Sequence, residues 1–241
     1  MTQVAPLLLV TGRPGVGKTT LVREVARRLG PGAAGFFTEE VRPAPGAPRT
    51  GFDLVTWPEG RRVALARVPG GQAVGEVREG TGGGTGGEER VLRPAGRVGR
   101  YLVYVEGLET VGLEALRRGE ADAGVRLLVL DEIGRMECLS RAFRAAVEAL
   151  FRRRTKALLA TARGGWGAGG VGRGMAGVGR GTTGASRGTG GTSGSAGDAE
   201  SLVAVLEALP GVEVLELTPA NRGRMLREVL ARLNPGRPTA P

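Results

Sequence analysis

The sequence predicts an α/β fold in which a mostly parallel central sheet is flanked by helices and carries an antiparallel hairpin extension. Two observations favour the parallel part: a glycine-rich loop at residues 12–19 follows an apolar run, and the apolar run at 127–130 ends in two acids. A third favours the hairpins, because β-like segments between residues 34 and 68 are separated by short Pro/Gly turns.

We expect one domain over residues 1–241, interrupted by two tracts that are too rich in glycine to pack. The chain has 44 glycines, and many of them fall in these tracts. Residues 79–87 predict a flexible link, and residues 163–197 predict a disordered insert. Without them roughly 190 residues remain, the size of a single α/β domain.

Composition excludes several kinds of chemistry. There is no histidine, and Cys138 is the single cysteine, which excludes an internal disulfide, a Cys/His zinc site and a histidine base. Any catalysis must therefore use carboxylates, Lys, Arg and a bound metal ion. The net charge of +10 comes almost wholly from arginine. A basic surface suits nucleotides and, less specifically, nucleic acid, although a general compositional bias explains it as well.

No apolar run approaches the length of a membrane span, and the first loop glycine is already at position 12. We therefore expect a cytoplasmic monomer without a membrane partner.

Residues 7–20 predict a phosphate-binding loop between a strand and a helix. Gly12, Gly17, Lys18 and Thr19 fill the pattern G-x-x-x-x-G-K-[ST]. Glycines let consecutive N–H groups wrap an anion, and the helix dipole favours negative charge at the same point. We expect Lys18 to reach the β- and γ-phosphates and Thr19 to ligate Mg²⁺. Thr20, which begins the helix, is counted with this loop.

The alternative is a plain glycine turn. Leu7–Val10 is suited to a buried strand, and Leu21, Val25 and Leu29 recur at helical spacing, so the context favours nucleotide binding.

Further strands are predicted at 34–41, 49–57, 62–68 and 101–105, with a short helix from Leu113. The run at 126–132 resembles a Walker B strand, which places Asp131 beside the phosphates as a Mg²⁺ ligand and Glu132 beside the attacking water. A solvated carboxylate or a helix cap is the alternative for Glu132.

A helix is predicted from Ser140, and Lys156–Thr161 is a further buried strand. Thr161 either senses the γ-phosphate or caps the strand end. The helix is expected to bury Phe143, Ala146, Val147, Leu150 and Phe151. Cys138 is expected to pack as a small apolar residue.

The Arg-Gly steps of residues 163–197 are similar to loosely RNA-binding sequences. Because aromatic residues are not interleaved with them, a surface loop is favoured over RNA binding.

The C-terminal part predicts a helix over 199–209, a strand over 212–217 and a final helix. We expect the first of these to bury Leu202, Val205, Leu206 and Leu209. Asn221 and Arg222 either contact the base or ribose, or they cap and solvate the last helix.

These motifs occur in an order that resembles the small P-loop nucleoside-triphosphatase family. The stretches that carry the resemblance are 12–20, 35–42, 49–55, 98–101, 131–137 and 221–222. It implies a RecA-like P-loop NTPase fold and slow Mg²⁺-dependent hydrolysis of ATP, GTP, CTP, UTP and TTP. It also implies nucleotide contacts at Gly12, Arg13, Pro14, Gly15, Val16, Gly17, Lys18, Thr19, Leu127, Leu128, Val129, Leu130, Asp131, Glu132, Ile133 and Gly134.

The chain departs from this family at two points. Arg135 stands where Lys is common, and the glycine tract replaces a short loop after Thr161. We expect water to attack the γ-phosphate in line, with Lys18 and Glu132 as the catalytic residues and Arg42 or Arg49 neutralising developing charge. The rivals are a P-loop kinase with a small acceptor and an RNA-binding ATPase that uses the Arg-Gly tract.

Overall fold

The computed structural model describes residues 5–70, 74–75, 90–164 and 193–233. The expected flexible link at 79–87 lies outside these residues, and so does most of the expected insert at 163–197. The two ends of that insert are described, and both differ from the expectation.

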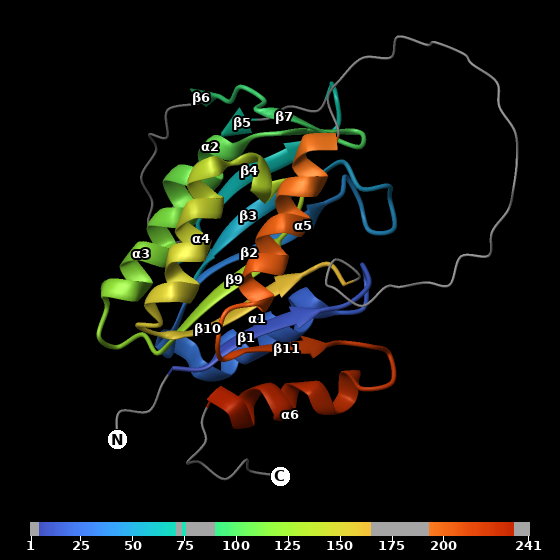
Figure 1. Cartoon of the computed structure of the whole chain (residues 1–241). Helices are drawn as coiled ribbons and strands as arrows, with labels where there is room; N and C mark the ends of the chain where they lie inside the picture. Colours follow the sequence, from blue (N-terminus) through green and yellow to red (C-terminus); the bar gives the residue numbers. More distant parts are fainter. Residues whose placement is uncertain (1–4, 71–73, 76–89, 165–192, 234–241) are drawn as a thin grey trace, which may run out of the picture.

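Nine strands of the described residues form one sheet in the order β11-β1-β10-β9-β2-β3-β4-β8-β7 (Figure 1). Neighbouring strands from β11 to β2 run parallel, and those from β2 to β7 run antiparallel. The predicted mostly parallel sheet with an antiparallel extension is thus confirmed. The strands are β1 (Leu7–Thr11), β2 (Ala33–Val41), β3 (Gly51–Trp57), β4 (Arg62–Arg67), β7 (Gly96–Val98), β8 (Tyr101–Val103), β9 (Leu127–Ile133), β10 (Ala157–Ala162) and β11 (Val212–Glu216). The short strands β5 (Val74–Gly75) and β6 (Arg90–Val91) pair separately.

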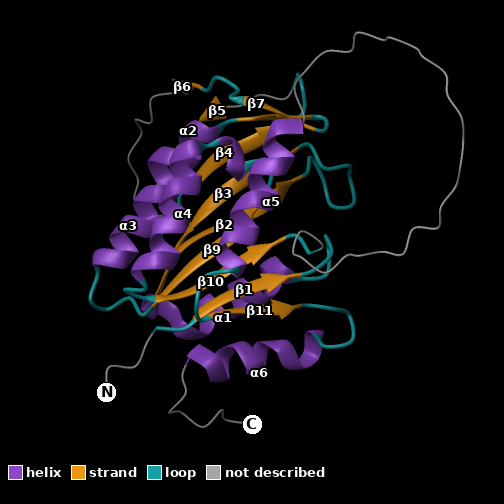
Figure 2. Ribbon diagram, in the orientation of Figure 1, coloured by secondary structure: helices purple, strands orange, loops and turns teal. Residues whose placement is uncertain are grey.

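Helices cover both faces of the sheet (Figure 2). On one face lie α2 (Val105–Gly107), the π-helical turn Leu108–Gly112, α3 (Leu113–Ala121), α4 (Arg141–Arg153) and α5 (Ser193–Glu207). On the other lie α1 (Lys18–Leu29) and α6 (Arg222–Leu233). Alternate residues of β1 enter the two cores, Leu7 and Leu9 the first and Leu8 and Val10 the second, as period-two strand geometry requires. Short 3₁₀ turns at Gly30–Gly32 and Glu137–Leu139 connect elements.

Most predicted core positions are buried. In α4, Phe143, Val147 and Phe151 are fully buried, and the Ser140 hydroxyl caps the helix by accepting the N–H of Phe143 at 2.9 Å. The Cys138 side chain is buried among apolar neighbours.

The helix α5 differs from the prediction in its start and in its buried face. It begins at Ser193, so residues 193–197, for which we expect disorder, are helical. Val205 is 38% exposed, whereas Val203 is fully buried. The buried stripe is Ala199, Leu202, Val203 and Leu206. Leu202 and Leu206 are buried as predicted, and Leu209 packs partly buried against the same core. The prediction for Val205 was wrong, because helical spacing alone does not determine which neighbouring residue meets the sheet.

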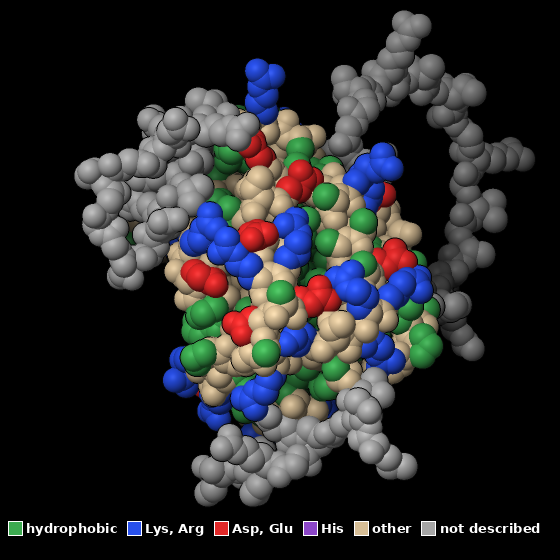
Figure 3. All heavy atoms as spheres, turned by 90° about the vertical axis from the view of Figure 1, so that its left-hand side faces the viewer, with side chains coloured by type: hydrophobic (Ala, Val, Ile, Leu, Met, Phe, Trp, Pro, Cys, Tyr) green, Lys and Arg blue, Asp and Glu red, His purple; other side chains and the backbone are tan. Residues whose placement is uncertain are grey.

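The outer surface of α3 and α4 carries intermixed acidic and basic side chains (Figure 3). Glu114 pairs with Arg117 and Arg118 on α3, and Glu148 pairs with Arg152 on α4. Such pairs one turn apart are typical of solvated helix faces. Within the described ranges, we find no helix with the length and apolar character needed to cross a membrane.

Gly35, the first residue of the stretch 35–42, lets β2 approach β9 closely. Its φ is +139°, and a Cβ there would overlap the carbonyl oxygen of Val129 on β9. No other residue type combines that backbone angle with that contact. Gly35 therefore sets the position of the far end of β2 relative to β9.

We predict that Gly35→Ala lowers the free energy of unfolding by clearly more than 1 kcal/mol, because it adds a backbone clash to the strain of a positive φ. Gly46→Ala is the control, since Gly46 also has a positive φ, of +80°, but a Cβ there meets no atom within 4 Å. Urea denaturation measures both, and equal losses would contradict the assigned packing role.

Candidate active site

The loop between β1 and α1 is shaped by glycines with positive φ. The φ values of Gly12, Gly15 and Gly17 are +147°, +76° and +106°. A Cβ at Gly12 would lie 2.5 Å from the carbonyl oxygen of Leu217, directly after β11. The Gly12 carbonyl oxygen itself accepts the N–H of Gly164 at 3.0 Å. The segments that follow β10 and β11 thus hold the loop in place.

Lys18 points back into this loop from the first turn of α1. Its ammonium donates to the carbonyl oxygen of Gly12 at 3.1 Å and lies 3.8 Å from Oε2 of Glu132. The side chain is only 6% exposed. A buried ammonium beside main-chain N–H groups forms a strongly positive cradle of the kind that binds phosphate.

The ends of β9 and β10 bring Asp131 to the start of α1. Between the pairs Ala160–Leu130 and Ala162–Ile133, Thr161 alone faces both Asp131 and Glu132, which is a β-bulge. The Thr161 hydroxyl donates to Oδ1 of Asp131 at 2.5 Å. Asp131 is fully buried, and Thr161 therefore supports a carboxylate at the strand end.

The other oxygen of Asp131, Oδ2, is buried and has no hydrogen-bond partner among the described residues. Burial raises the pKa of Asp131, while the hydroxyls of Thr161 and Thr19 and the charge of Lys18 act in the opposite direction. A carboxylate with a spare oxygen beside a threonine hydroxyl is a donor set of hard oxygens. The residues present therefore fit Mg²⁺.

Two more carboxylates follow Asp131. Burial, with the adjacent charge of Asp131, raises the pKa of Glu132. Glu137 is 4% exposed, and burial, reinforced by the charge of Glu132, raises its pKa to about 8. Glu137 is thus a neutral acid at pH 7, whereas the carboxylate of Glu132 reaches the cavity in front of the phosphate loop.

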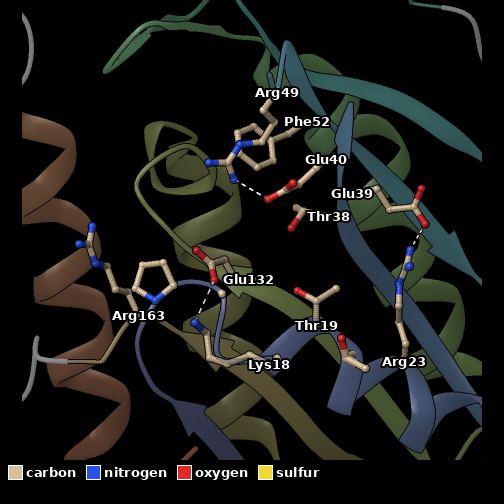
Figure 4. A pocket seen from close by; sticks show the side chains of 14 residues that line it. Lys18, Thr19, Arg23, Thr38, Glu39, Glu40, Arg49, Phe52, Glu132 and Arg163 are labelled. Carbon is tan, nitrogen blue, oxygen red and sulfur yellow. Dashed lines mark hydrogen bonds and ion pairs between the residues drawn. The ribbon is translucent and has the colours of Figure 1, made fainter. Parts of the chain in front are cut away.

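A cavity of about 680 Å³ opens in front of the loop (Figure 4). Lys18, Thr19 and Glu132 face one another across its floor, and Thr38 and Phe52 stand above them. Its remaining lining residues are Pro14, Gly15, Gly17, Thr20, Arg23, Glu39, Glu40, Arg49 and Arg163.

Three arginines bring positive charge to this cavity. Arg49 lies over the ring of Phe52 at 5.1 Å and pairs with Glu40 at 2.5 Å. Arg23 pairs with Glu39, and Arg163 stands on the opposite side (Figure 4). Arg42 pairs with Glu40 outside the cavity lining. Of the two expected charge stabilisers, the structure brings Arg49 to the site and not Arg42.

A second cavity of about 420 Å³ lies on the other side of the loop. Arg13 and Arg222 line it, and a Cβ at Gly17 would lie 3.8 Å from Nε of Arg222. Asn221 is not among the lining residues, because its side chain accepts the N–H of Thr218 and donates to the carbonyl oxygen of Glu216. The other lining residues are Pro14, Gly15, Val16, Glu216, Leu217, Thr218 and Pro219.

The aliphatic part of β9 does not face either cavity. Leu127, Leu128, Val129 and Leu130 are at most 1% exposed and divide between the two cores. Ile133 is equally buried, and Gly134 lies against the carboxylates of Glu132 and Glu137. The structure therefore places Glu132 at the cavity and Asp131 just beneath it, while the preceding residues serve the core.

Sequence reasoning missed several lining residues. Arg23 follows Thr19 by four residues, so one helical turn puts both on the same face of α1, a usable signal. Arg163 was assigned to the disordered insert, yet the cavity includes it. Thr38 and Phe52 lie in the stretches 35–42 and 49–55 that carry the family resemblance, but they come from two strands whose pairing could not be derived from spacing.

Comparison with known proteins shows consistent relatives. The NTPase family model matches residues 7–164. The nucleoside-triphosphatase THEP1 of Thermotoga maritima is 39% identical over 144 residues, 60% of this chain and 67% of that protein. The crystal structure of THEP1 from Aquifex aeolicus matches with a TM-score of 0.60 and 29% identity, covering 94% of this chain and 98% of the other. The solution structure of a human cancer-related nucleoside triphosphatase matches with a TM-score of 0.62 and 30% identity, covering 97% of this chain and all of the other.

We predict that stability depends on the ionisation of Glu137. In the folded chain the pKa of Glu137 is about 8, against an ordinary value of 4.5 in the unfolded chain. The protonated carboxyl therefore adds to the free energy of unfolding fully below pH 4.5, and this stabilisation is lost as the pH rises through 8. Glu137→Gln cannot ionise, and its melting temperature should fall less than that of the wild type between pH 5 and pH 8. Glu59→Gln, at an exposed carboxylate, is the control. The same pH slope in Glu137→Gln and wild type would contradict the prediction.

Proposed function

Because the chain belongs to the NTPase family, we propose that it hydrolyses ATP, GTP, CTP, UTP and TTP to the diphosphate and phosphate in the cavity between Lys18 and Glu132. By its family the chain is a nucleoside-triphosphatase and a P-loop enzyme. Our proposal extends this family activity to a substrate range, to Mg²⁺ as the metal, and to a role for each residue of the site. The convergence of the phosphate loop with Asp131 and Glu132 is the observation that supports them most strongly.

In this proposal the loop N–H groups and Lys18 bind the β- and γ-phosphates. The Lys18 ammonium now has carbonyl oxygens and Glu132 as neighbours, and phosphate oxygens would replace them. Arg23, Arg49 and Arg163 stand around the space in which the γ-phosphate would lie. Their charge compensates the negative charge that spreads over the transferred group in the transition state.

Glu132 orients the attacking water and accepts its proton. It lines the cavity opposite the phosphate loop, and the raised pKa makes its carboxylate a better base than an exposed glutamate. The bond from phosphorus to the β–γ bridging oxygen breaks as the bond to the water oxygen forms. Glu132 then releases the proton to the departing phosphate or to solvent.

Thr19 and Asp131 would hold Mg²⁺, with Thr161 fixing the Asp131 carboxylate. The ion, when bound, draws charge from the β- and γ-phosphate oxygens. Among the described residues no cluster of three or more acids, cysteines or histidines could hold a metal unaided. This fits an ion that shares its ligands with the substrate.

The second cavity is proposed to receive the base. Arg13 and Arg222 offer guanidinium planes, which stack on any base without selecting its hydrogen-bonding edge. Broad base tolerance follows from this lining. Asn221 would act through the turn that positions Arg222 rather than by contact with the nucleotide.

We predict that Glu132→Gln binds triphosphate as the wild type does but hydrolyses it about 10²–10⁴-fold more slowly, because the base is lost and the shape is kept. Phosphate release across the five triphosphates, with and without Mg²⁺, measures the rate, and a fluorescent nucleotide measures binding. Lys18→Ala is the comparison, since it should lose both binding and turnover. Unchanged phosphate release in Glu132→Gln would reject its role as the base.

We also predict that Arg49→Ala lowers kcat about 10²-fold, the usual loss when one charged donor to the transition state is removed. Arg42→Ala is the matched control, because Arg42 shares the partner Glu40 but does not line the cavity. Equal effects of the two substitutions would show that Arg49 acts only through the Glu40 ion pair.

A further inference from the structure

A third cavity, of about 190 Å³, adjoins the candidate active site at Glu132. It shares Thr38, Phe52, Glu132 and Arg163 with the large cavity. Its own wall consists of Val98, Arg135, Met136 and Glu137. Because Glu132 lines both spaces, its carboxylate can face a phosphoryl group in one and a second molecule in the other.

The lining of this third cavity combines acidic, basic and apolar side chains. Glu132 supplies a base at the boundary with the large cavity, and Glu137 is neutral at pH 7. Arg135 and Arg163 supply positive charge, and neither has an ion-pair partner within the described parts of the chain. Phe52, Val98 and Met136 supply apolar surface between them. An inorganic anion alone would leave the base and the apolar wall without a complement.

We propose that the third cavity binds a second substrate, a small molecule with a hydroxyl group at one end and an anionic group at the other. The hydroxyl lies at Glu132, the carbon skeleton covers the apolar wall, and the anion pairs with Arg135 and Arg163. This proposal rests on the proposed function, because the triphosphate in the large cavity is the phosphoryl donor.

The transfer balances without a further reactant. The acceptor hydroxyl loses its proton to the Glu132 carboxylate, its oxygen bonds to the γ-phosphorus, and the bond to the β–γ bridging oxygen breaks. The products are a nucleoside diphosphate and a phosphomonoester of the acceptor. When the third cavity holds water, the same geometry gives hydrolysis.

The size of the cavity limits the acceptor. Its volume of about 190 Å³ is less than a third of the 680 Å³ of the large cavity. A three-carbon hydroxy acid or a triose-sized phosphate fits this space, whereas a second nucleotide does not. Glycerate and glycerol 3-phosphate represent the two anionic groups, carboxylate and phosphate, on similar skeletons.

The test incubates the full-length protein with γ-labelled ATP and Mg²⁺, alone and with glycerate or glycerol 3-phosphate. Inorganic phosphate and ADP are both measured. Hydrolysis gives them in a ratio of one. With an acceptor we expect the ratio to fall at least twofold and labelled phosphomonoester to appear.

Arg135→Ala should return the ratio to one with the acceptor present, while its hydrolysis without acceptor stays at the wild-type rate, because Arg135 does not line the large cavity. Arg141→Ala, at an exposed arginine at the start of α4, should behave as the wild type.

A ratio of one with both probes would overturn the acceptor site and leave the hydrolase proposal standing. So would inhibition by added inorganic phosphate that Arg135→Ala relieves while the ratio stays at one, because the cavity would then hold the product anion. Absence of ADP under every condition would overturn both proposals together.

Discussion

The site depends on a carboxylate that is buried at the end of a strand. Asp131 is fully buried, yet only one of its oxygens has a hydrogen-bond partner among the described residues. Such a group is costly to bury, and a parallel sheet makes the cost tolerable by bringing the ends of β1, β10 and β9 to one edge. Thr19, Thr161 and Lys18 all come to Asp131 for that reason. A fold with a different order of β1, β10 and β9 would not bring these groups to the Asp131 carboxylate.

The sequence predicted the parts of this arrangement that short-range chemistry determines. The phosphate loop, the aliphatic run of β9 and the helix α4 each carry their own signature, a glycine pattern, an acid pair or a serine cap with a helical stripe. The parallel sheet with an antiparallel extension followed from those parts. Family membership, expected from the order of the motifs, is confirmed by the family match and by the solved relatives.

What could not be predicted depends on contacts between distant segments. The burial of Val205 in α5 was wrongly predicted, because Val203 and Val205 both fit a helical stripe with Leu202 and Leu206, and only the packing against the sheet decides between them. The cavity side chains Thr38 and Phe52 lie in stretches whose order was informative but whose pairing was not, and Arg163 lies outside every motif. Arg42 and Arg49 look equivalent in the sequence, and the path of the chain after β2 separates them. Which residues become buried or line the cavity thus depends on how distant segments pack together, and residue type alone does not determine it.

The hydrogen bond from Gly164 to Gly12 joins the phosphate loop to the last residue described before position 193. A chain entering at Gly164 is therefore tethered to the very carbonyl that also receives the Lys18 ammonium. For protein engineering, a fluorescent or affinity module inserted between Gly164 and α5 would therefore begin one hydrogen bond away from the phosphate loop.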